Sequence, residues 1–355
     1  MIYLESLLWA LPITVLALFM LRPIAMQIGL VDLPSGRKSH GRIVPVIGGI
    51  GMFVGILAGT WLLPGAHPEF MWMLIGCTVL VFVGILDDRF AIAYYPRLVA
   101  QIGVVLLMYL GGGLSIAQVG DVIGTGVVNL GPLALAMTAL VTLTVINAFN
   151  FIDGVDGLAG SLALVTLIAI AIATATMGGD PVVLIIAAIF SGALLGFLAF
   201  NFPVGKWRAR LFMGDAGSMM VGFVIVWLTI TITQGERAVI SPVAGLWFAL
   251  LPISDLFTCF MIRIKRGKSP FHPGHEHFHY TLRRGGFSDR GILFVLVGLS
   301  AIYAAVGLLG IYFAIPDWLL FWGWIFICFT QHLPMRRLAI LRRLIVFKRD
   351  GVFAR

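Results

Sequence analysis

The sequence predicts an all-α polytopic membrane protein with about eleven transmembrane helices. Of its 355 residues, 60% are hydrophobic and only 11% are charged, and the mean hydropathy is +1.04. Soluble globular domains are not this apolar. The polar residues are too few and too clustered for a separate water-soluble domain, so we expect residues 1–355 to form a single integral membrane domain. Three cysteines, at positions 77, 259 and 328, lie in apolar segments and are expected to be packing residues.

Eleven apolar segments of about 17–23 residues each have the length needed to cross the hydrocarbon core of a bilayer. They span roughly residues 2–21, 46–64, 70–86, 97–113, 132–149, 159–177, 181–199, 216–234, 241–262, 291–313 and 317–333. The first begins without a basic leader or a small-residue cleavage site, so we expect it to be a retained helix.

The basic residues indicate the orientation of these helices. If the connecting loops are sorted alternately, one set holds 23 of the 24 Lys and Arg residues and the other holds only Arg237. The positive-inside rule then places the N-terminus outside and the C-terminus in the cytoplasm, with a basic cytoplasmic tail at about 334–355. The net charge of +8 reflects this orientation, and we expect no nucleic-acid partner.

The stretch 147–160 carries the strongest functional signal in the chain. Asn147, Asn150 and Asp153 recur every three residues, so they share one face if the preceding helix continues, and Asp156 follows among glycines. A helix N-cap accounts for Asp153 or Asp156 alone. It does not account for four polar groups at the mouth of a membrane helix, which we interpret as a site.

Further carboxylates lie at the ends of other segments. Asp87 and Asp88 end the third segment, where adjacent charges repel unless a cation or a proton relieves them; a solvated helix end is the alternative. Asp215, between glycines at the start of the eighth segment, suits a ligand for a hard metal or an N-cap. Asp255 lies inside the ninth segment, which makes it a functional candidate.

Cationic groups gather in the same cytoplasmic loops. Lys38 and His40 lie between two arginines in the first loop and suit a phosphate, with contact to anionic lipid as the alternative. Four of the seven histidines occupy the last cytoplasmic loop: His272, His275, His277 and His279. A loop without cysteines does not provide a closed zinc site. Imidazoles beside Arg283 fit an anionic diphosphate better.

Together, these loops predict carboxylates for Mg²⁺ and cations for phosphates on one membrane surface. The substrates should therefore be phosphorylated, with at least one of them in the membrane. Phosphoryl transfer mainly requires positioning and charge neutralisation, which such a site supplies.

The motifs resemble those of the polyprenyl-phosphate N-acetylhexosamine-1-phosphate transferases, most closely the bacterial WecA/TagO-type branch. They occur in family order from the first loop to the tenth helix. The matching elements are Asp32-x-Pro34-x-x-Arg37-Lys38-x-His40 with Gly48-Gly49, Asp87-Asp88-Arg89, Asn147-x-x-Asn150-x-x-Asp153-Gly-x-Asp156-Gly-Leu158, Gly214-Asp215-x-Gly217-Ser218, Ser269-Pro-Phe271 and His277-x-His279.

The resemblance implies transfer of a sugar 1-phosphate from a UDP-N-acetylhexosamine, GlcNAc being the commonest, to undecaprenyl phosphate. The products are UMP and a lipid-linked diphosphate sugar that starts a cell-surface glycan. It also implies Mg²⁺ as the cofactor, with Mn²⁺ as an alternative, and a multi-pass location in the bacterial inner membrane. Membrane lipid is a further partner, and a homodimer is consistent with relatives.

The resemblance also implies roles for individual residues. Asp215 would ligate Mg²⁺ with Asn150 as a second ligand, and Asp87 and Asp88 would position metal-bound phosphates, with Asp87 as a candidate base. The remaining groups would bind substrate: Asp156 and Asp153 the uridine, and Lys38, His40, His277 and His279 the sugar diphosphate, with Asn147 in the same site.

This chain departs from the family pattern at three positions. Ala91 replaces an acid that often follows the aspartate pair. The last motif often reads Arg-x-His-x-His-His, but this chain has His275 and Tyr280 at the first and last positions. Arg283 or Arg284 is the candidate to compensate for the missing arginine.

Two other functions compete with this interpretation. A phospho-MurNAc-pentapeptide transferase usually has ten helices and a His-His-His run, neither of which matches this chain. A lipid-linked-sugar transporter would place polar residues along its helices through the middle of the membrane, where Asp255 is nearly the only one.

Overall fold

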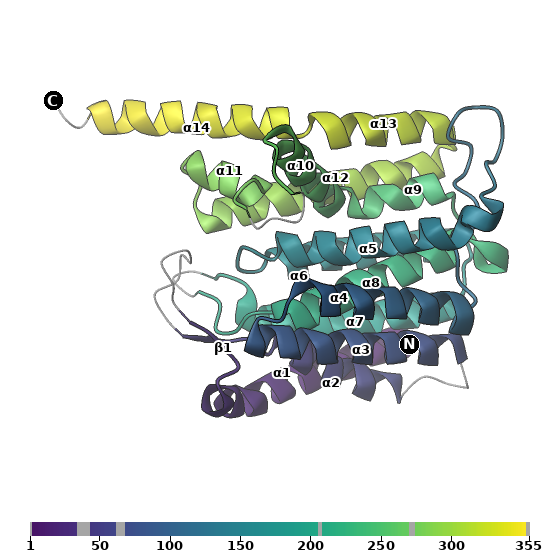
Figure 1. Cartoon of the computed structure of the whole chain (residues 1–355), viewed down its shortest axis with the longest axis horizontal. Coiled ribbons are helices and arrows are strands. Elements are labelled where there is room, and N and C mark those ends of the chain that lie inside the picture. The colour runs from purple at the N-terminus through teal and green to yellow at the C-terminus, as the bar shows by residue number, and fades with distance from the viewer. Residues whose placement is uncertain (1, 34–42, 62–67, 205–207, 270–273, 353–355) are drawn as a thin grey trace.

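The computed structural model describes residues 2–33, 43–61, 68–204, 208–269 and 274–352. Its long helices lie side by side with nearly parallel axes (Figure 1). The α-helices are α1 Ile2–Ile28, α2 Gly48–Thr60, α3 Pro68–Phe90, α4 Tyr94–Leu106, α5 Ala134–Ile152, α6 Leu158–Thr176, α7 Pro181–Asn201, α8 Gly214–Thr233, α9 Pro242–Leu246, α10 Leu250–Lys265, α11 Phe278–Arg284, α12 Asp289–Tyr312, α13 Asp317–Thr330 and α14 His332–Val352. Four short helical segments complete them: the π-helix η1 Leu107–Gly111 and the 3₁₀-helices η2 Gly131–Leu133, η3 Gly235–Arg237 and η4 Trp247–Ala249.

This architecture confirms the predicted class, an all-α polytopic membrane protein. Within the described residues, nine helices are long and apolar enough to cross a membrane. Two further apolar helices, α2 and α13, are shorter, with 13 and 14 residues. Thirteen helical residues span about 20 Å, less than the hydrocarbon core. The count of eleven spans and the orientation therefore stay predictions.

Helix α8 forms the centre of the bundle. It packs against α2, α3, α5 and α6, and nearly all of its residues are buried. Small residues permit the closest approaches: a Cβ on Gly49 of α2 would collide with the Gly217 nitrogen, and one on Gly84 of α3 would collide with the Ala216 backbone. Such contacts between small residues are the usual way in which membrane helices pack closely. Here they fix the N-terminus of α8 against two neighbours.

A small antiparallel sheet closes the same end of the bundle. Strand β1 (Val31–Asp32) pairs with β2 (Val44–Pro45) in the register Val31↔Pro45. Gly48 then donates a backbone hydrogen bond of 2.9 Å to the Phe212 carbonyl. The first loop is thereby attached to the segment that leads into α8.

Two helical regions differ in detail from the sequence expectation. The ninth segment, expected as one helix over 241–262, is divided into α9, η4 and α10. Pro252 has no N–H to offer the Phe248 carbonyl, which instead accepts a hydrogen bond of 2.8 Å from the Thr166 hydroxyl. The basic tail at 334–355 is largely the helix α14, which continues almost directly from α13 and extends past the bundle beside α11 (Figure 1).

Candidate active site

Three helix ends bring the predicted acidic residues together. Asp87 and Asp88 lie in the last turn of α3, Asn150 in the last turn of α5, and Asp215 in the first turn of α8. The Asn150 amide donates to Asp215 Oδ1 and, at 3.0 Å, to Ser218 Oγ. We call Asp87, Asp88, Asn150 and Asp215 the acidic cluster. Residues 127 positions apart in the chain thus converge at one end of the bundle.

Asp88 has a structural task within the acidic cluster. Its Oδ1 accepts a hydrogen bond from the Asp215 backbone N–H at 2.9 Å, and its Oδ2 accepts one from the Ala216 N–H at 3.3 Å. It therefore caps the N-terminus of α8 from a different helix, where a negative charge is favourable. Gly214 precedes this turn with a φ of +74°, a conformation that favours glycine. The cap holds the backbone at Asp215 in place.

Arg97, at the start of α4, was not predicted as a site residue. Its Nη1 lies 2.5 Å from Asp87 Oδ2 and 3.1 Å from Asp215 Oδ2. The guanidinium thus joins the carboxylates of α3 and α8 at a single nitrogen. The sequence analysis included Arg97 only among the basic residues of the loops. Its position, ten residues after Asp87, is the one sequence feature that could have suggested a contact with the aspartate pair.

Asn147 lies one turn deeper in α5 and has other partners. Its Nδ2 donates to Gln101 Oε1 and to the Leu143 carbonyl, both at 2.8 Å. Gln101 in turn reaches the Met219 sulfur at 3.5 Å. Asn147 thus connects α4, α5 and α8 beneath the acidic cluster, an arrangement that supports the cluster from below.

The loop 153–157 joins α5 to α6 beside the acidic cluster. Asp156 Oδ2 accepts a hydrogen bond from the Ala209 N–H at 3.0 Å. Asn201, which the sequence analysis did not single out, accepts from the Gly157 N–H at 2.7 Å and donates to the Leu211 carbonyl at 2.8 Å. Both contacts hold the loop 153–157 against the segment that precedes α8.

Asp153 is the C-cap of α5 and directly precedes Gly154, the residue that lies against His279. Burial raises the pKa of Asp153 to about 7, and the charges of Asp215 and Asp156 act in the same direction. A carboxyl of this kind retains a proton in part near neutral pH. Closely spaced acids with a raised pKa are frequent at catalytic sites.

The two histidines of the last motif stack at the start of α11. Their rings are nearly parallel, with an angle of 10° and 5.6 Å between centroids. His279 lies against the loop 153–157, because a Cβ on Gly154 would be only 2.6 Å from its Nε2. Both ring nitrogens of His279 are buried without a hydrogen-bond partner among the described residues, and burial lowers its pKa to about 3. A neutral imidazole therefore faces the loop with unused hydrogen-bonding capacity.

His277 is held from the opposite side by Asp255. Its Nδ1 lies 2.7 Å from Asp255 Oδ2, and Asp255 Oδ1 accepts from the Phe278 N–H at 2.7 Å. Cys259 Sγ lies 3.3 Å from the same Nδ1. These three groups have a composition that can hold a metal, and their ligand atoms lie within 4.8 Å of one another. In this structure the His277 Nδ1 contacts the Asp255 and Cys259 atoms directly.

Among the predicted binding residues, Arg283 has partners outside this convergence. Arg283 forms an ion pair with Asp289 at 2.7 Å and lies over the Tyr280 ring at 5.9 Å. Lys38 and His40 fall outside the described residues. Their predicted contacts with a diphosphate therefore stay predictions.

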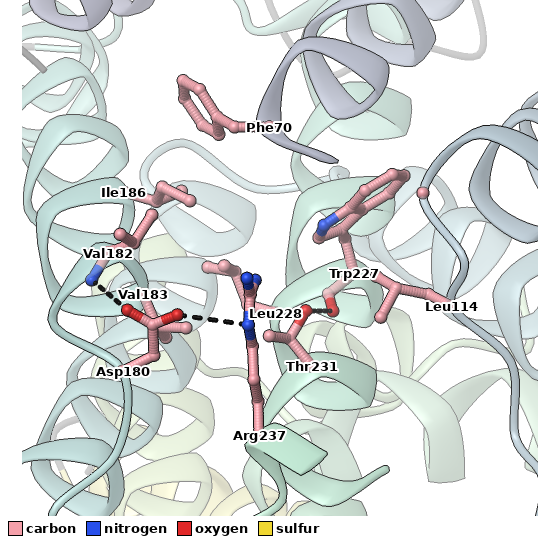
Figure 2. Close-up of a pocket in the computed structure, with 11 residues that line it drawn as sticks. Phe70, Leu114, Asp180, Val182, Val183, Ile186, Trp227, Leu228, Thr231 and Arg237 are labelled. Carbon is pink, nitrogen blue, oxygen red and sulfur yellow. Dashed lines mark hydrogen bonds and ion pairs between the residues drawn. The ribbon is translucent and has the colours of Figure 1, made fainter. Parts of the chain in front are cut away.

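A small cavity lies at the other end of the bundle (Figure 2). It is lined mainly by apolar side chains such as Phe70 and Trp227, and Asp180 and Arg237 form an ion pair of 3.3 Å at its edge. Its lining includes no member of the acidic cluster and neither of the stacked histidines. We therefore identify the site by its converging polar groups.

The donor set of the acidic cluster fits a hard divalent cation. Asp87 Oδ2 and Asp215 Oδ2 both point at the same positive nitrogen of Arg97, so the two carboxylates already converge on one point of positive charge. Carboxylate and amide oxygens are the usual protein ligands of Mg²⁺. Asp87, Asp215 and Asn150 are the residues that would hold the ion.

The chain is similar to known proteins over most of its length. The family model described as Glycosyl transferase family 4 matches residues 70–233. A protein of Escherichia coli O157:H7, named "Undecaprenyl-phosphate alpha-N-acetylglucosaminyl 1-phosphate transferase", is 34% identical over 86% of this chain and 84% of its own length. A protein of the same name from Haemophilus influenzae is 37% identical over 88% of each chain.

Proposed function

The chain belongs to glycosyl transferase family 4, and from this premise we propose that it transfers GlcNAc 1-phosphate from UDP-GlcNAc to undecaprenyl phosphate. The names of the relatives supply the acceptor and the sugar. The observation that carries the proposal is the convergence of Asp87, Asn150 and Asp215 at one end of the bundle beside the two stacked histidines. Such a site combines oxygen ligands for a metal ion with hydrogen-bond donors for phosphates.

The reaction exchanges one phosphoanhydride bond for another. A phosphate oxygen of the lipid attacks the β-phosphorus of the UDP-sugar, the bond between the bridging oxygen and the β-phosphorus breaks, and UMP leaves with the electron pair. Bound Mg²⁺, or Mn²⁺ in its place, would neutralise charge on the diphosphate. The products are UMP and a diphosphate-linked lipid sugar.

In this proposal the residues of the acidic cluster have different roles. Asp215 and Asp87 would hold the metal, with Asn150 as a neutral ligand, and Asp88 would keep Asp215 in position by capping α8. Asp87 is also the candidate base that removes a proton from the lipid phosphate. Arg97 contacts both metal-binding carboxylates, so it would move onto a phosphate oxygen when the metal takes its place.

The histidine side of the site would bind the donor. His279 is neutral and has two unused nitrogens, which suits a hydrogen bond to a phosphate or sugar oxygen. Lys38 and His40 would add positive charge to the diphosphate, His277 would contact it through its ring, and Arg283 would join them after leaving Asp289. Asp156 and Asp153 are the candidates for the uridine.

We place this site at the cytoplasmic surface of the bacterial inner membrane. The support is the distribution of Lys and Arg, 23 of which fall in loops on the motif side of the predicted topology. The lipid phosphate would reach the acidic cluster from the bilayer, and the UDP-sugar would arrive from the cytoplasm.

The test is UMP release by the purified protein in detergent with undecaprenyl phosphate and Mg²⁺. UDP-GlcNAc, UDP-GalNAc and UDP-MurNAc-pentapeptide are compared as donors. We expect UMP from UDP-GlcNAc alone, lost with EDTA and restored by added Mg²⁺. UMP release only from another donor would mean that the protein transfers a different sugar. If folded protein released no UMP from any donor, the proposed function would be rejected.

A further inference from the structure

Asp255 is a buried carboxylate that the proposed reaction does not use directly. It lies in the second turn of α10, only 1% of its surface is exposed, and it belongs to a membrane-spanning helix. A carboxylate in such a place is costly unless specific donors compensate it. The donors that lie against it are the His277 ring and the Phe278 backbone N–H, both at 2.7 Å.

We infer that Asp255 is a positioning residue for donor binding, which fixes His277 in the tautomer with a proton on Nδ1 and directs Nε2 towards the UDP-sugar. An ionised carboxylate only accepts hydrogen bonds, so the atom opposite Asp255 Oδ2 must be a protonated Nδ1. The unprotonated nitrogen of the neutral ring is then Nε2, and it becomes a second donor when the ring is protonated. Carboxylates that orient histidines in this way often affect function strongly.

The second bond of Asp255 places the ring in space. The Phe278 N–H is one of the donors at the start of α11 that lack a partner within the helix, and Asp255 Oδ1 takes the place of a cap. Phe278 itself is buried, with 1% of its surface exposed. One carboxylate thus holds both the backbone and the ring of the histidine motif, and through the stacked rings it also supports His279.

Asp255→Asn separates these two contacts. The amide oxygen still accepts from the Phe278 N–H, while the amide N–H₂ then faces His277 Nδ1 and favours the tautomer protonated on Nε2. Thr258→Val is the matched control, because Thr258 is buried on the same helix and its hydroxyl has no partner among the described residues. Thermal unfolding of both variants checks that each is folded.

The first measurement is the ¹⁵N NMR spectrum of histidine-labelled protein in detergent, with His277 assigned by its loss in His277→Gln. The chain has only seven histidines, which makes the assignment practicable. We expect Nδ1 to be protonated in the wild type and in Thr258→Val, and the proton to move to Nε2 in Asp255→Asn. An unchanged His277 tautomer in Asp255→Asn would overturn the inference.

The second measurement, which rests on the proposed function, is UMP release. We expect Asp255→Asn to lower kcat/KM for the UDP-sugar on the order of 10- to 100-fold, with KM for undecaprenyl phosphate unchanged. In a His277→Gln background the same change should add little. If Asp255→Asn lowered kcat/KM by the same factor in the His277→Gln background as in the wild type, Asp255 would not act through His277. Failure of the proposed function would remove the activity of the wild type but leave the NMR result intact.

Discussion

The acidic cluster and the histidine motif occupy the same end of the bundle but are held in different ways. The acidic cluster belongs to α3, α5 and α8. The close approaches of α3 to α8 at Gly84 and of α2 to α8 at Gly49 leave no space for a Cβ. The histidine motif begins α11, a helix of seven residues that depends on Asp255 at its start and on α14 beside Gly285. We therefore expect changes in the acidic cluster to affect chemistry, and changes near the histidines to affect geometry first.

The largest effect is expected for Asp215→Asn. The amide keeps the size of the side chain but removes the charge that would hold the metal, so kcat for UMP release should fall on the order of 10²- to 10³-fold. Thermal stability should change little, because the α8 cap by Asp88 uses the backbone at position 215. Asp121→Asn is the control, because Asp121 lies in the loop before α5 and its backbone N–H is bonded to Asp317 at the start of α13, away from the acidic cluster. Full activity of Asp215→Asn with Mg²⁺ would disprove the metal role.

Arg97→Ala tests whether the acidic cluster needs the positive charge of the Arg97 guanidinium. Loss of charge-assisted hydrogen bonds should lower kcat/KM about 10- to 100-fold. Mg²⁺ should bind more tightly to this variant in a calorimetric titration without substrate, because the ion no longer displaces the guanidinium. Arg237→Ala, an arginine with an aspartate partner far from the site, should change neither quantity. Weaker Mg²⁺ binding in Arg97→Ala would contradict this account.

His279 should make the stability of the protein depend on pH. Its pKa is about 3 when folded and about 6.5 when unfolded, so the unfolded chain binds the extra proton between these values and stability falls as the pH is lowered through 6.5. The loss between pH 7 and pH 5 is about 2 kcal/mol. Thermal unfolding at both pH values should show a smaller decrease in Tm for His279→Gln than for the wild type; an identical decrease would exclude the buried neutral histidine as the cause.

Gly154→Ala tests the contact between the two regions. The new Cβ would lie 2.6 Å from His279 Nε2, so the ring must move, at a cost of about 1–3 kcal/mol. We expect roughly a 10-fold increase in KM for the UDP-sugar with kcat nearly unchanged. Gly103→Ala is the matched control, because a Cβ added there would meet no described atom within 4 Å. Equal KM and kcat values for the two variants would show that the contact between His279 and the loop 153–157 does not affect binding of the UDP-sugar.

The sequence was sufficient for the class of protein and for its family. Apolar segments of membrane-spanning length follow from composition alone, and the motifs from Asp32 to His279 retain their order and spacing in one chain. The similarity to relatives named as GlcNAc-1-phosphate transferases agrees with that assignment. The assignment of single site residues to metal, base or sugar stays a prediction.

The tertiary structure decided how these residues share their tasks. Periodicity places Asn147 and Asn150 on one face, but only helix packing directs Asn147 to Gln101 and Asn150 to Asp215. The contacts of Asp88 with the Asp215 backbone, of Arg97 with the Asp215 carboxylate and of Asp255 with His277 join residues 127, 118 and 22 positions apart. Local patterns cannot encode such pairs, because their distances are set by how the helices cross.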